Sequence, residues 1–157
     1  MSSARGLANH HLYLARLVLA AWRDEDQAGQ VPAPVLAGAF GPGVRDHLQR
    51  AYGWFLLAIA APDEQPPVPP ARLAELPPCA EGRARAGELR EFEQLEAAGW
   101  LADLLAWQPP ALGRRERSPG NLARPAAVRG GGSEDFGAWA EALERCFQRM
   151  GDSLNEY

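Results

Sequence analysis

The chain has 157 residues, a formal net charge of −4, 46% hydrophobic residues and 23% charged residues, values typical of one globular domain. All its basic residues except histidine are arginine, which excludes lysine Schiff-base chemistry and phosphate sites built on a lysine. The two cysteines, Cys79 and Cys146, fit neither a disulfide scaffold nor a zinc spacing, so we expect a reduced, cytoplasmic protein without a metal or cofactor.

The first predicted element is an amphipathic helix over about residues 8–28. Its apolar positions recur three or four residues apart, which places them on one face: Leu12, Ala15, Leu19 and Trp22. Four more apolar residues broaden that face: Leu14, Leu17, Val18 and Ala21. Such a wide face predicts contact with more than one neighbouring helix, and Gly29 predicts the C-terminal end.

A loop is expected next, because Pro32, Pro34 and Gly41-Pro42-Gly43 punctuate the chain, with room only for a short helical turn at 35–40. A second helix is predicted over about 44–60 and ends before Pro62. Its apolar stripe contains Val44, Leu48, Ala51, Phe55 and Ala58. The first two helices should form an antiparallel hairpin. The apolar run 51–61 has roughly half the length that spans a membrane, so no membrane contact is expected.

The loop over 62–80 is rich in proline, which favours an extended connector with few hydrogen bonds. Helices are then predicted over about 83–98 and 100–107, with a break at Gly99. Four acidic residues of the third helix lack a following Glu-x-x-His pattern, so we interpret them as a solvated face rather than a di-iron site. They are Glu88, Glu91, Glu93 and Glu96.

The segment 108–132 reads as a basic, flexible loop that ends in three glycines. It contains one Glu and five arginines, and these are our candidate partner-binding residues: Arg114, Arg115, Arg117, Arg124 and Arg129. The loop has no aromatic residue to stack on bases, so binding to nucleic acid should be weak.

A last amphipathic helix follows, with Ser133 as its expected N-cap and Glu134 and Asp135 in its first turn. Its apolar positions alternate four and three residues apart, which predicts a seam that packs against another helix. The seam contains Phe136, Ala140, Leu143, Phe147, Met150 and Leu154. We therefore expect an all-α bundle of four to five helices, with Pro-rich and Arg/Gly-rich connecting loops, forming a single domain over 1–157.

No residue pattern predicts a catalytic site. Adjacent His10 and His11 point about 100° apart on a helix and cannot easily share one metal ion. His47 is expected to be a buried or half-buried structural histidine, beside an ion pair between Asp46 and Arg50. The spacing of Arg5 and His10 resembles the Arg-(x4–6)-His motif of a helical ribonuclease type, but that motif belongs on a late helix. A degenerate nuclease-like bundle is therefore only an alternative.

Several apolar segments resemble, in the same order, an uncharacterised proteobacterial family of short helical proteins with a domain of unknown function. The segments are 14–22, 47–52, 100–105 and 139–143. The resemblance implies an all-helical, single-domain, cytosolic bacterial protein. It carries over no activity and no functional residue.

These observations favour a non-enzymatic interaction or regulatory protein with an unknown protein partner. The alternative is a nucleic-acid-associated helical module that uses the Arg-rich loop. An exposed cluster of tryptophans would favour protein binding, and His47 converging with acids in a pocket would favour an enzyme. Arginines gathered on one surface would favour nucleic acid.

Overall fold

The structure, a computed structural model, describes residues 2–78, 87–111 and 131–154. Within these ranges the chain forms five α-helices and one 3-10 helix, and no strand. The predicted all-α bundle is therefore confirmed. The elements are α1 (Ala4–Ala28), α2 (Ala33–Ala60), η1 (Leu73–Glu75), α3 (Gly87–Ala98), α4 (Trp100–Ala106) and α5 (Ser133–Leu154). Among these described helices, none has both the length and the apolar character to cross a membrane.

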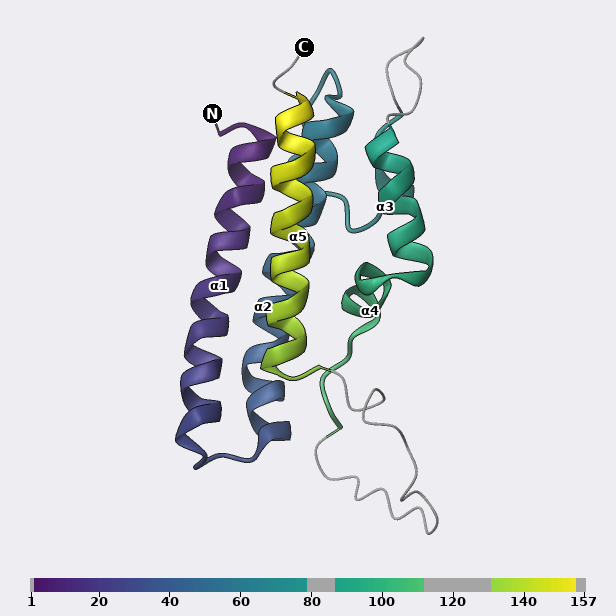
Figure 1. Ribbon diagram of the computed structural model, residues 1–157. Coiled ribbons are helices and arrows are strands. Elements are labelled where there is room, and N and C mark those ends of the chain that lie inside the picture. The colour runs from purple at the N-terminus through teal and green to yellow at the C-terminus, as the bar shows by residue number, and fades with distance from the viewer. Residues whose placement is uncertain (1, 79–86, 112–130, 155–157) are drawn as a thin grey trace.

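Three long helices form the centre of the fold. α1 and α2 make the predicted antiparallel hairpin, and α5 lies along both of them, as Figure 1 shows. α3 and α4 pack against the side of α2 and α5 that faces away from α1 (Figure 1). This arrangement covers α2 on several sides and leaves α1 at one edge of the molecule.

α1 begins about one turn earlier than predicted. Ser3 accounts for the difference, because its hydroxyl accepts a hydrogen bond from the backbone N–H of Gly6 at 3.0 Å and so caps the helix. The predicted end is confirmed: Gly29 adopts a left-handed φ of 66° and its N–H donates to the carbonyl of Glu25. The predicted inner face is also confirmed, since Leu12, Ala15, Leu19 and Trp22 are buried.

The predicted loop before the second helix is wrong. α2 starts at Ala33 and continues without a break through Gly41-Pro42-Gly43. Proline inside a helix removes a backbone hydrogen bond and costs about 3 kcal/mol, so packing must offset this cost. Gly41 shows how: a Cβ here would collide with Trp107, so the missing side chain lets that ring pack against the helix.

The connector after α2 is fixed more firmly than an extended proline-rich chain. Pro70 lies so close to Gly53 of α2 that a Cβ on the glycine would collide with the proline carbonyl. Pro70 and Leu73 are buried, and the N–H of Ala71 donates to the Glu75 carboxylate at 2.7 Å. The connector is therefore part of the packed structure around α2.

The later helices follow the predictions closely within the described residues. α3 is described from Gly87, α4 is separated from it at Gly99, and the predicted seam of α5 is buried from Phe136 to Met150. Ser133 differs from its predicted role. It is the first residue of α5, and its hydroxyl hydrogen-bonds to the carboxylate of Asp26 in α1.

Candidate functional site

The predicted partner-binding arginines cannot be placed. Arg114, Arg115, Arg117, Arg124 and Arg129 all lie outside the described residues. Their binding to a charged partner, including nucleic acid, stays a prediction.

The three arginines of α1 are all directed at α5. Arg16 forms an ion pair with Glu144. Arg5 donates to the backbone carbonyl of Gly151 at 3.5 Å, and Arg23 fills the space beside Gly137 that a Cβ would need. The side of α1 that faces away from α5 therefore carries no arginine.

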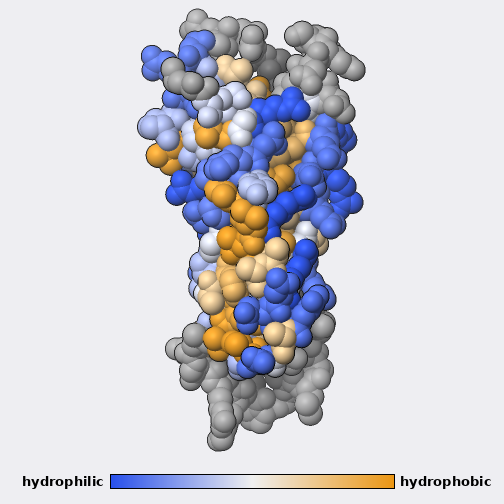
Figure 2. Space-filling view, turned by 90° about the vertical axis from the view of Figure 1, so that its left-hand side faces the viewer, coloured by the Kyte–Doolittle hydropathy of each residue, from blue (hydrophilic) through white to orange (hydrophobic). Residues whose placement is uncertain are grey.

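That outward side of α1 is apolar. We call it the outer face, and it consists of Leu14, Leu17 and Ala21, whereas Val18 packs against the core beside Gly43 of α2. Leu17 is 50% exposed, and two further exposed apolar residues follow in the chain: Val31, before α2, and Val35, in its first turn, are 36% and 42% exposed. Figure 2 shows this surface as an orange and tan band, bordered by hydrophilic residues, that reaches the lower end of the described chain. Single exposed apolar residues are ordinary, but a contiguous band is typical of an interaction site.

The prediction that these residues broaden a buried face is wrong for Leu17 and Ala21, which are exposed. The predicted contact of α1 with more than one helix is confirmed, since α1 packs on α2 and α5. No third described helix covers its remaining side (Figure 1). The residues 14, 17 and 21 show a second three-and-four spacing, which was the available signal of a second packing face.

The tryptophans do not form an exposed cluster. Trp22, Trp54 and Trp107 are buried, and Trp100 and Trp139 are half-buried. Trp22 and Trp107 both pack on Phe136, with ring centroids 5.4 and 5.1 Å away. The aromatic residues thus hold α5 to the other helices, and the exposed apolar surface is aliphatic.

The histidines meet where α1 and α2 lie side by side. His11 and His47 approach each other at 3.3 Å between their Nδ1 atoms, so one ring can donate to the other. Burial and the neighbouring His47, Arg50 and His10 lower the pKa of His11, whereas Asp46 opposes this shift. His47 is half-buried, as predicted, and the predicted Asp46–Arg50 ion pair is present at 2.9 Å. His47 thus meets a histidine of the hairpin rather than a set of acids in a pocket.

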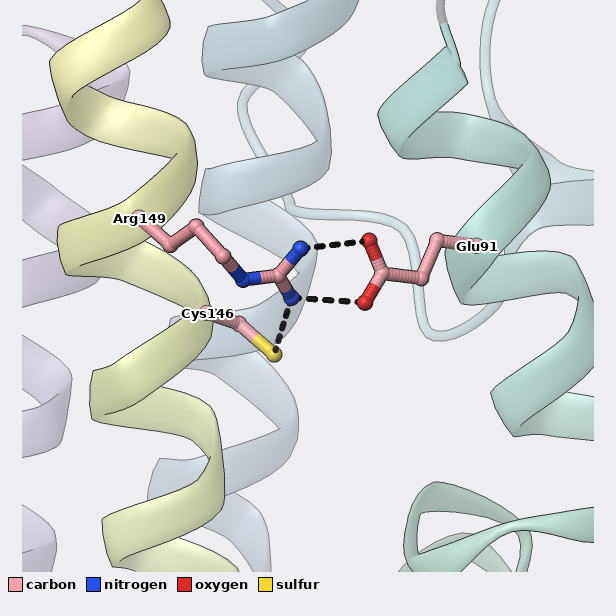
Figure 3. A network of polar contacts seen from close by, with 3 residues as sticks. All are labelled: Glu91, Cys146 and Arg149. Carbon is pink, nitrogen blue, oxygen red and sulfur yellow. Dashed lines mark hydrogen bonds and ion pairs between the residues drawn. The ribbon is translucent and has the colours of Figure 1, made fainter.

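One strong ion pair joins α3 to α5. The guanidinium of Arg149 donates to both carboxylate oxygens of Glu91, at 2.9 and 2.6 Å, and contacts the sulfur of Cys146 at 3.9 Å (Figure 3). The hydrogen bond from Arg149 lowers the pKa of Glu91, whereas burial raises the pKa of the Cys146 thiol. The thiol is therefore a packing group with little thiolate character.

Glu96, a second acid of α3, accepts hydrogen bonds from two partly buried groups. The Tyr52 hydroxyl donates to Glu96 at 2.5 Å, and the N–H of Leu73 donates to the same oxygen at 2.9 Å. Burial raises the pKa of Tyr52, and the hydrogen bond to Glu96 adds to this shift. The interpretation of the α3 acids as a solvated face was therefore wrong for Glu96, which faces α2, whereas Glu91 keeps an exposed side chain while it pairs with α5.

Residues for metal chemistry are not assembled in the part of the chain that the structure describes: no three His, Cys, Asp or Glu side chains there could hold one ion. Comparison with known proteins adds no constraint. No protein-family model, curated protein or solved structure matches this chain.

Proposed function

We propose that this protein is a non-enzymatic interaction protein, of a regulatory kind, that binds another polypeptide through the outer face of α1. The proposal depends on the half-exposed Leu17 of the outer face, together with the contiguous apolar band that Figure 2 shows on that side of the molecule. Apolar surface favours burial by about 25 cal/mol per Å², so a partner helix that covers the band would gain free energy.

The rest of α1 supports a binding role for this face. Its arginines and its inner apolar residues are directed at α2 and α5, so covering the outer face would break none of these contacts. The backbone there is helical and already ordered. A partner would therefore meet a preformed surface and would not have to order this segment.

Site-specific photo-crosslinking in the native host would test this function. A photoreactive residue replaces Leu17 on the outer face or, as a matched control, Val68 on the Pro-rich connector. Both side chains are apolar and strongly exposed, but only the first belongs to the band. We expect a discrete protein adduct from position 17 and none of that mass from position 68.

The result that would overturn the proposal is equally concrete. If position 17 gives no protein adduct, or gives only the adducts seen at position 68, the outer face of α1 is not a protein-binding surface. Nucleic acid crosslinked through the 108–132 segment instead would favour the alternative function.

A further inference from the structure

We infer that the occupant of this surface is a second copy of the chain, whose α1 helix packs antiparallel on the first with the two Leu17 residues at the two-fold axis. This inference rests on the proposed function, because it names the partner of the same outer face. Most soluble oligomers are symmetric homo-oligomers, and a two-fold interface uses the same patch twice.

The spacing along α1 suits a self-complementary contact. Residues 10, 14, 17, 21 and 24 are separated by four, three, four and three positions, which aligns them along one side of a helix. In an antiparallel pair centred on Leu17, Leu14 of one copy lies within one position of Ala21 of the other. A large side chain thus meets a small one on both sides of the axis, which allows the helices to approach closely.

The polar residues at the two ends of this row decide the orientation. His10 lies seven residues before Leu17, and Asp24 lies seven residues after it, so each is about two turns from the centre. Both are exposed. Antiparallel packing brings His10 of each copy to Asp24 of the other, whereas parallel packing would bring Asp24 to Asp24. An imidazole N–H can donate a hydrogen bond to a carboxylate, which favours the first arrangement, and the repulsion between two carboxylates disfavours the second.

The same residues argue against a lipid surface as the occupant. Helices that lie on membranes carry basic residues beside their apolar face. The arginines of α1 are directed at α5, and the outer face ends in Asp24. A second α1 supplies both the apolar residues and the complementary polar groups, an imidazole against each Asp24 carboxylate, in the required order.

Sedimentation velocity on the full chain, measured as a function of concentration, tests the association. We expect a dimer of the 17.0 kDa chain that Leu17→Glu weakens by at least about tenfold, because two carboxylates would then meet at the axis. Val68→Glu is the matched control and should leave the association unchanged. Circular dichroism verifies that both variants keep their helices. A wild-type chain that stays monomeric up to millimolar concentration would overturn the inference.

Cysteine crosslinking tests the orientation. The native Cys79 and Cys146 are first replaced by serine, and His10→Cys chains are mixed with Asp24→Cys chains under mild oxidation. Antiparallel packing predicts a disulfide in the mixture and little in either protein alone. Efficient crosslinking of His10→Cys with itself would show parallel packing and would overturn the inference.

Exchanging the two polar residues separates their pairing from simple apolar contact. His10→Asp alone should weaken the dimer, because two carboxylates then meet, and adding Asp24→His should restore it, because each pair again places an imidazole against a carboxylate. A double variant that is as weak as the single variant would contradict the arrangement.

The outcome for the dimer can be separated from the outcome for the proposed function. A monomeric purified chain that still gives a position-17 adduct with a different protein would refute the dimer and leave the binding surface standing. A monomeric chain without any position-17 adduct would refute both.

Discussion

α1 and α2 are neighbouring antiparallel helices of similar length, yet they are buried very differently. α2 contacts α1, α3, α4 and α5, and its residues 51–57 are buried without interruption. α1 has a buried inner face and an outer face on which Leu17 is half exposed. The same residue type therefore has different roles in the two helices. In residues 51–57 of α2 an apolar side chain stabilises the fold, whereas on the outer face of α1 it is accessible to a partner.

The largest expected difference comes from placing a charge on each helix. Leu56→Asp should destabilise the fold by on the order of 4 kcal/mol, because a carboxylate would enter the core without a partner. Leu56 in α2 is fully buried. Leu17→Asp in α1 should change the free energy of unfolding by less than about 0.5 kcal/mol.

Urea unfolding followed by circular dichroism, at dilute protein, measures both variants. Equal destabilisation by the two substitutions would show that the outer face of α1 is covered within the monomer.

Two glycines of α2 should respond in opposite directions to the same substitution. Gly53→Ala forces the Pro70 carbonyl away from the helix and should cost about 1–3 kcal/mol. Gly38→Ala meets nothing within 4 Å and should stabilise the helix by about 0.5–1 kcal/mol. Thermal unfolding of both variants tests this, and a neutral Gly53→Ala would mean that the connector does not pack on α2.

Removing one tyrosine hydroxyl from each helix compares a buried hydroxyl in α2 with an exposed one in α1. Tyr52→Phe in α2 removes the buried hydrogen bond to Glu96 and should cost about 1.5–3 kcal/mol. Tyr13→Phe in α1 changes an exposed side chain and should leave the stability unchanged. If denaturant titrations show the same small effect for both substitutions, the hydrogen bond from Tyr52 to Glu96 does not stabilise the fold.

The smallest expected effect is a pH dependence of the folding stability that arises from His11, where α1 and α2 lie side by side. The pKa of His11 is lowered in the folded protein from 6.5, so the unfolded chain binds the proton more readily. The folded state is therefore at its full stability above about pH 6.5, where His11 is neutral in both states. This part of the stability is lost as the pH falls through the pKa that His11 has in the folded protein. His11→Asn should remove this decline, whereas His10→Asn should keep it.

The measurement is unfolding as a function of pH in the Leu17→Glu background, where self-association does not contribute. A pH profile that His11→Asn leaves unchanged would exclude this histidine as its source.

The candidate sites differ in how far a local pattern can predict them. The predicted arginine site in 108–132 lies outside the described residues. Which side of α1 is the outer face depends on where α2 and α5 pack. Apolar periodicity identifies a side chain that can be buried, but it does not distinguish burial in the same chain from burial against another one.

The sequence by itself determined the helical class, the seam of α5 from Phe136 to Met150, and the end of α1 at Gly29, because these depend on periodicity and on local backbone preference. Only the tertiary structure decided that α2 continues through Pro42, since Trp107 from a distant segment packs where Gly41 has no side chain. It also decided which side of α1 stays exposed. Both results depend on contacts between residues far apart in the chain, which no local pattern records.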